Sequence, residues 1–203
     1  MAKSANTAAL ANLRNFLDVL GWGYLRVGTD MLRGLFGDTS GQWHWVAHCS
    51  SDSRFLVFCS FCPINVARKR RAATAEYLMR ANWGLSFGNF EIDWSDGQVQ
   101  FRTTIPIETP GRLPEAMEHL VYGNCALMNQ YLPGLLAVAC GKTSPKTAVR
   151  RAEGKIAGQR GAANAAAQAQ VASSPSPQGT ADLPEENGLN SGPRFRRFLP
   201  GDN

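Results

Sequence analysis

The sequence predicts an α+β fold: a five-stranded, mostly antiparallel sheet with helices packed on it, in the order α-β-β-β-α-β-β-α. Two observations carry this prediction. Apolar residues change along the chain from the three-to-four spacing of a helix to the alternation of a strand, and back again. In addition, Asp96-Gly97 stands between two alternating runs, which is a strong signal for a β-hairpin.

The N-terminal segment has the periodicity of an amphipathic helix. Its apolar residues share one helical face: Leu10, Leu13, Phe16, Leu17 and Leu20. Asn6 or Thr7 is placed to cap the start of this helix, and Gly21 to end it.

Three strands are expected next, over residues 31–36, 42–49 and 54–62. The first has the weakest pattern, because apolar and polar residues alternate poorly around it. The third is apolar at both odd and even positions, which is typical of a strand in the middle of a sheet. The Ser-Asp-Ser sequence at 51–53 predicts the turn before it.

A second helix is predicted over residues 66–82, where the apolar spacing becomes helical again. The hairpin follows it. One strand is expected over residues 89–94 and its return over 98–105, with Asp96-Gly97 as a two-residue turn between them.

A long helix is predicted over residues 114–132, on an apolar stripe that is almost continuous and includes one polar residue, Asn124. Pro133-Gly134 is expected to interrupt this helix before a short apolar continuation. Ser144-Pro145 joins a capping residue to a proline, which predicts a last helix over residues 145–153.

The composition of the chain changes near residue 154. Every Trp, Tyr and Cys lies at or before Cys140, and residues 158–203 are mainly Ala, Gln, Gly, Ser and Pro. Such a segment buries too little apolar surface to offset its ordering entropy. We therefore predict one folded domain over residues 1–153 and a disordered, low-complexity tail over 154–203.

The formal net charge of the chain is +5, and its sequence pI is about 9.1. This excess is too small to be a nucleic-acid signature by itself, so the sequence argues against a nucleic-acid partner. The densest basic run is Arg68-Lys69-Arg70-Arg71. It is either the solvated start of a helix or a contact patch, and it is the candidate contact site of the chain.

No secretory signal is expected in the first 20 residues, because polar residues interrupt their apolar pattern. No stretch approaches the ~18 apolar residues of a membrane span. Its five cysteines are an odd number in a chain with a substantial core, which indicates reduced thiols. A cytoplasmic protein without a membrane partner is expected.

The element order and several short stretches resemble the YbjN family, whose fold is similar to that of type III secretion chaperones. The stretches that carry the resemblance are residues 75–82, 87–93, 96–102, 120–128 and 131–135. The resemblance covers roughly residues 10–153 and consists of core and turn residues, so it guides the fold more than the activity. It implies a bacterial protein labelled as a sensory transduction regulator, with no established catalytic site.

Cys59-Ser60-Phe61-Cys62 is the most prominent chemical motif. A redox pair needs a helix N-terminus to stabilise its thiolate, whereas these cysteines stand at the end of a predicted strand. Residues three apart on a strand also point to opposite faces, which favours packing. A metal site is the other interpretation, with ligands from two strands expected to pair: His44, His48, Cys49, Cys59 and Cys62.

Other catalytic patterns are weak or missing from the sequence. It contains no nucleophile elbow, phosphate loop or dinucleotide-binding glycine motif. Glu91 and Asp93 share one predicted strand face, as an acid–base pair or the residues of a solvated outer face do; the solvated face is the more common case. The segment 193–200 interleaves basic and apolar residues, as a short docking motif or an unstructured terminus does.

These observations favour a non-enzymatic binding or chaperone-like regulatory protein that needs no cofactor. We expect it to form a homodimer and to bind protein partners, because the apolar residues exceed what one layer of helices covers. Two alternatives stay open: a metal- or thiol-dependent sensor or enzyme that uses the His/Cys strands, and an RNA-associated accessory protein that uses Arg68, Lys69, Arg70 and Arg71.

Overall fold

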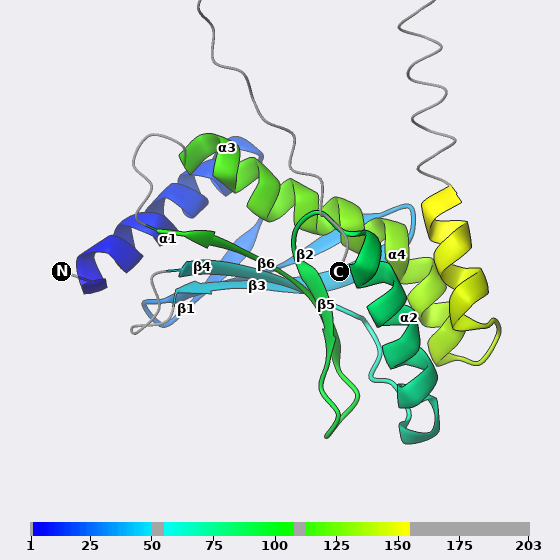
Figure 1. Ribbon diagram of the computed structural model, residues 1–203. Coiled ribbons are helices and arrows are strands. Elements are labelled where there is room, and N and C mark those ends of the chain that lie inside the picture. The colour runs from blue at the N-terminus through cyan, green and yellow to red at the C-terminus, as the bar shows by residue number, and fades with distance from the viewer. Residues whose placement is uncertain (1, 50–54, 108–112, 155–203) are drawn as a thin grey trace, which may run out of the picture. The chain divides into compact units, whose positions relative to one another are not determined.

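The structure, a computed structural model, describes residues 2–49, 55–107 and 113–154, which all lie in one compact unit of the chain. One antiparallel sheet runs through this unit in the order β1-β2-β3-β4-β6-β5 (Figure 1). Its strands are β1 (Tyr24–Val27), β2 (Met31–Asp38), β3 (Gly41–Cys49), β4 (Phe55–Phe61), β5 (Asn89–Ile92) and β6 (Val99–Pro106).

The helices are α1 (Ala2–Val19), α2 (Arg71–Gly84), α3 (Leu113–Glu118), α4 (Asn124–Ala139) and a last helix over residues 145–154. A short 3-10 turn, η1 (Arg68–Arg70), precedes α2, and a π-helical turn, η2 (His119–Gly123), joins α3 to α4. The predicted last helix is therefore confirmed. No helix in the described ranges is long and apolar enough to cross a membrane.

The predicted α+β class and antiparallel sheet are confirmed, but the predicted number of strands is wrong, because the sheet has six. The missed strand is β1, which forms a hairpin with β2 around a turn at Gly28. It has only four residues and lies at the edge of the sheet, where it is largely exposed. An edge strand of this kind carries no alternation of buried and exposed residues that a sequence pattern could reveal.

The prediction that residues 54–62 form a central strand is confirmed, because β4 pairs with β3 on one side and β6 on the other. On β3 and β4 every second side chain is buried beneath α1, η2 and α4. The largest of these are Trp43, Trp45 and Phe58. In Figure 1 the helices lie on one side of the sheet, and none of them covers the other side.

The π turn depends on a buried polar cluster at the centre of the molecule. The Thr103 hydroxyl donates a hydrogen bond to the Leu120 carbonyl oxygen over 2.8 Å. Asn124, which is fully buried, donates through Nδ2 to the carbonyl oxygens of Phe58 and Phe101, both at 3.1 Å. The side chain of Asn124 thus links the long helix to strands β4 and β6.

The expected break at Pro133-Gly134 is wrong, because α4 continues through Pro133 to Ala139. A proline in a helix removes one backbone donor. Helix α4 nevertheless continues, and it is held against α2 at the neighbouring residues. The Tyr77 hydroxyl donates to the Tyr131 carbonyl oxygen over 2.8 Å and lies close against Gly134. A side chain at position 134 would keep α2 from approaching so closely.

The predicted hairpin is confirmed, but its turn is longer than two residues. Asp93 N–H donates to the Gln98 carbonyl oxygen, and Gly97 N–H donates to the Asp93 carbonyl oxygen, each over 2.8 Å. Gly97 has a φ of +82° and lies directly against the Val66 carbonyl. The turn is wider because it is docked on the segment that leads into η1.

Several predictions fall outside the described residues. These are the turn at 51–53, the tail over 154–203 beyond residue 154, and the docking motif at 193–200.

Candidate functional site

The face of the sheet opposite the helices is the most distinctive surface of the described residues, and we call it the open face. Strand register defines its members, because antiparallel partners point to the same side. Val46 lies between Arg33 of β2 and Cys59 of β4, and Cys59 is next to Arg102 of β6.

The open face is mainly apolar over β1–β4, where Arg33, His44 and His48 are its ionisable members. Leu35 is 64% exposed, Leu25 60% and Phe55 47%. Other apolar residues of this face are partly exposed: Val27, Met31, Val46, Val57 and Phe61. A contiguous apolar surface of this kind marks an interaction site more often than a feature of the fold.

A polar border closes the open face on the β5–β6 side. Arg102 forms an ion pair with Glu91 over 2.9 Å, and Gln100 donates to the same carboxylate over 2.7 Å. Asn89 donates to its other oxygen over 3.0 Å. These three partners hold the Glu91 carboxylate in place as part of the border. Asp93 lies beyond β5 and accepts hydrogen bonds from Ser95.

The two histidines of β3 lie on the open face, as their spacing predicts. His44 stacks on Phe61 with ring centroids 4.8 Å apart and an angle of 10° between the planes. Burial lowers the pKa of His48, and the Arg102 charge lowers it further, while Asp30 opposes the shift. This surface therefore gains no charge from His48 at neutral pH.

Cys59 and Cys62 point to opposite sides of the sheet, as predicted from their offset of three. Cys62 belongs to the core beneath the helices, whereas Cys59 lies on the open face and is only 4% exposed. Burial raises the pKa of Cys62 to about 11 and also raises that of Cys59, although Arg102 opposes the second shift. Neither thiol is held as a thiolate, so this geometry does not activate the motif for redox chemistry.

The proposed metal ligands do not converge either. Cys49 lies on the helix side of β3, while His44 and His48 lie on the open face. Within the described residues, no group of three or more His, Cys, Asp or Glu side chains is placed to hold a metal ion.

The structure divides the basic run of the candidate contact site into two pairs. Arg70 donates to the Val138 carbonyl oxygen over 2.6 and 3.1 Å, at the end of α4. Arg71 donates to the carbonyl oxygens of Val66, Trp94 and Ser95, and so fixes the hairpin turn. Arg68 and Lys69 are exposed to solvent. Two of the four side chains therefore hold elements together, and two are free to make contacts.

The open face was not among the sites predicted from the sequence. The sequence does contain an indication of this face on the two strands beside β4. There, His44 and His48 of β3 and Arg102 of β6 alternate with core residues. Polar residues at these positions indicate that the second face is not covered by helices, even though β4 itself is apolar on both faces.

The comparison with known proteins agrees with the element order. A family model named YbjN, described as "Putative bacterial sensory transduction regulator", matches residues 9–136. No curated protein sequence matches the chain. The match runs from α1 to the last turn of α4 and includes the whole sheet, which is more than half of the 203 residues. The chain therefore belongs to the YbjN family.

Proposed function

We propose that the chain is a non-enzymatic regulatory protein that works by binding another protein on the open face of its sheet. The observation that carries this proposal is the exposed apolar surface over β1–β4, bordered by the Glu91–Arg102 ion pair. The description of the family as a regulator supports it. The resemblance to type III secretion chaperones, which dimerise and hold extended partner segments, supports it by analogy.

A second copy of the chain is the first partner that this surface fits. From strand spacing and rise, the face measures roughly 25 by 24 Å, or about 600 Å² in projection. Side-chain relief adds to this area, which brings it close to the roughly 800 Å² that each partner buries in an interface of standard size. Two such faces can pack as two aligned sheets do, about 10 Å apart.

The test is a substitution at the centre of the open face. Val46→Glu places a carboxylate where a partner would exclude water, and stripping the water from that charge costs several kcal/mol even when a cation lies beside it. Its cross-strand neighbour Arg33 offers a partner for the carboxylate in the monomer, so the variant is expected to fold. In sedimentation equilibrium at high micromolar concentration, we expect a dimer for the native chain and a monomer for Val46→Glu.

Val19→Glu is the matched control, because Val19 is 86% exposed at the end of α1 and lies away from the sheet. It should leave the dimer unchanged. A native chain that remains monomeric, or a dimer that survives Val46→Glu, contradicts self-association through this face. A bacterial protein that the native chain and Val19→Glu retain, and Val46→Glu does not, would then identify the regulatory partner.

A further inference from the structure

The basic residues of the chain are concentrated in two segments that the fold brings to one end of the molecule. Residues 68–71 and 142–151 hold eight of the 21 Lys and Arg residues and no carboxylate. The remaining 13 basic and 16 acidic residues leave the rest of the chain with a net charge of −3. The positive charge of the whole chain therefore comes from these two segments.

Three observations show that the segments meet. The Arg70 guanidinium reaches Val138 and lies close to Gly141, just before the second segment. At the other end of the two helices, Glu153 lies beside Gly84. Helix α2 and the last helix therefore run side by side in the same direction, and both begin at the same end, as Figure 1 shows.

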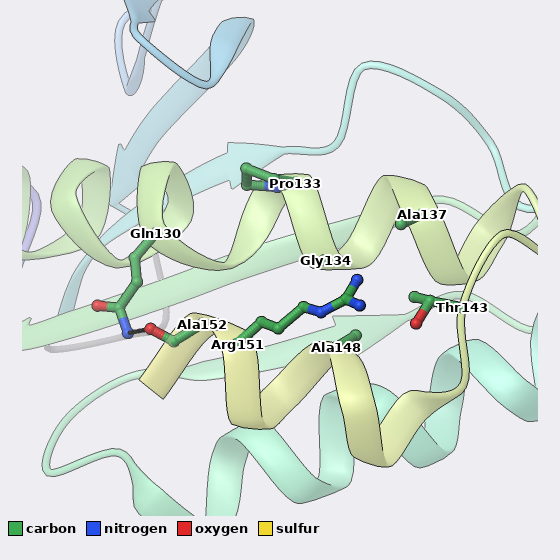
Figure 2. A pocket seen from close by; sticks show the side chains of 8 residues that line it. All are labelled: Gln130, Pro133, Gly134, Ala137, Thr143, Ala148, Arg151 and Ala152. Carbon is green, nitrogen blue, oxygen red and sulfur yellow. Dashed lines mark hydrogen bonds between the residues drawn. The ribbon is translucent and has the colours of Figure 1, made fainter. Parts of the chain in front are cut away.

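Four cations are exposed at this end, and two more extend the charge along the last helix. We call the six the basic end: Arg68, Lys69, Lys142 and Lys146 at the end itself, and Arg150 and Arg151 along the helix. The ion pairs among described residues join Glu76 to Arg80 and Glu91 to Arg102, so they involve none of the six. Figure 2 shows the Arg151 side chain lying in the groove between α4 and the last helix, on the side of Thr143. The groove, at about 190 Å³, is smaller than the roughly 300–1,000 Å³ of sites for small-molecule ligands.

Three of these cations, Arg68, Lys69 and Lys146, lie at positions that are unfavourable for the isolated domain. A helix N-terminus carries a partial positive charge and is stabilised by acidic side chains. The first turn of α2 has none, and the last helix has Lys146 in its first turn and no carboxylate before Glu153. An anion bound here would be attracted by both helix dipoles as well as by the side chains.

We propose that the basic end binds the phosphate backbone of double-stranded nucleic acid. Protein interfaces depend on apolar or aromatic anchors and are depleted in lysine, whereas three of these six residues are lysines and none is apolar. Single-strand sites stack successive bases on several aromatic side chains. Trp94, which is 60% exposed beside Arg71, is a single such side chain next to the basic end. Cations on a rigid helical surface instead suit a duplex, which presents its phosphates on the outside.

This inference is independent of the open face and concerns this chain more than its family. The family match ends at residue 136, before the second basic segment. In the sequence the run at 68–71 stands alone and gives no nucleic-acid signature. Only the packing of the last helix beside α2 doubles the charge at that end.

The test is fluorescence anisotropy of the full chain with a labelled duplex of about 20 base pairs, as RNA and as DNA, and with the matching single strands. If all six cations neutralise phosphates, a plot of the logarithm of the binding constant against the logarithm of the salt concentration should have a slope of about −5. Affinity should then fall about a thousandfold between roughly 50 and 200 mM salt.

Lys142→Glu/Lys146→Glu should weaken duplex binding by at least about tenfold and reduce the slope by about 2. Both side chains are exposed, and a carboxylate at position 146 suits a helix N-terminus, so this variant is expected to fold. Arg26→Glu/Arg80→Glu is the matched control, because it changes the net charge equally at exposed positions on β1 and near the end of α2, outside both basic segments and the open face. The affinity of this control variant for the duplex should stay within about threefold of the native value, because its substitutions lie away from the proposed phosphate contacts.

Three outcomes would overturn the proposal. The first is no duplex binding at low salt, and the second is an equal loss of affinity in the two double variants. The third is tighter binding to single strands, or to vesicles of anionic lipid, than to either duplex. Melting midpoints of both variants close to the native value ensure that a loss of binding is not a loss of folding.

Discussion

Gly97 is a residue whose backbone conformation and packing both demand glycine. It has a φ of +82°, and a Cβ atom there would collide with the Val66 carbonyl. We expect Gly97→Ala to reduce the free energy of unfolding by about 2 kcal/mol or more, because the left-handed conformation alone costs an L-residue about 1–2 kcal/mol. Urea denaturation measures this loss.

Gly28→Ala separates the two causes. Gly28 has a φ of +64°, but the nearest atom to a Cβ there is Asp30 Oδ1 at 3.6 Å. The free energy of unfolding of this variant should fall by only about 1 kcal/mol, which is the cost of the left-handed backbone conformation alone. Equal losses at the two positions would mean that the contact between the hairpin turn and Val66 contributes nothing.

His48 makes the stability depend on pH. Burial, followed by the charge of Arg102, lowers its pKa in the folded state below the 6.5 of a free histidine. The unfolded chain therefore takes up the proton first as the pH falls, so the stability from this residue is complete above about pH 6.5 and decreases below it. We expect His48→Gln to flatten the fall in unfolding free energy between about pH 7.5 and 5.5. An unchanged pH profile would show that His48 is not the cause.

At the scale of elements, the long helix is joined to the sheet by Asn124. Its amide donates to carbonyl oxygens of β4 and β6 and also to the Thr103 hydroxyl, all at 3.1 Å. Removing a buried donor leaves its acceptors unsatisfied, at about 1–3 kcal/mol for each group. We expect Asn124→Ala to lower the unfolding free energy by about 3 kcal/mol, measured by urea denaturation.

Asn129→Ala is the control for this element, because Asn129 lies on the same helix but bonds to Ser40 and Asp38 at a more exposed site. This variant should lower the unfolding free energy by less than about 1 kcal/mol, which is typical for the loss of an ordinary hydrogen bond. Similar losses for the two variants would show that the buried cluster does not anchor the π turn.

At the scale of the whole molecule, the boundary between domain and tail is still a prediction. The described residues end at 154, with the last helix packed beside α4 through Ala148 and Ala152. Residues 158–203 have few apolar side chains to bury, so removing them should leave the melting temperature nearly unchanged. A fall of more than a few degrees in a thermal melt would place the boundary later in the chain.

The sequence by itself determined the class and order of most elements, because burial on alternate or helically spaced positions is a local pattern. It placed β4 in the centre of the sheet, the last helix after Ser144, and Cys59 and Cys62 on opposite faces. It failed at β1, at the π turn and at Pro133, where edge exposure and packing by distant residues override local preference.

The tertiary structure alone decided the two candidate surfaces. An apolar strand face has the same sequence pattern whether helices or a partner cover it. The arrangement of the helices on one side of the sheet is what leaves Val46 and its neighbours uncovered. In the same way, residues 68–71 and 142–151 are about 70 positions apart in the sequence. Their charges combine only because α2 and the last helix begin side by side, and Coulomb interactions depend on distance in space, not along the chain.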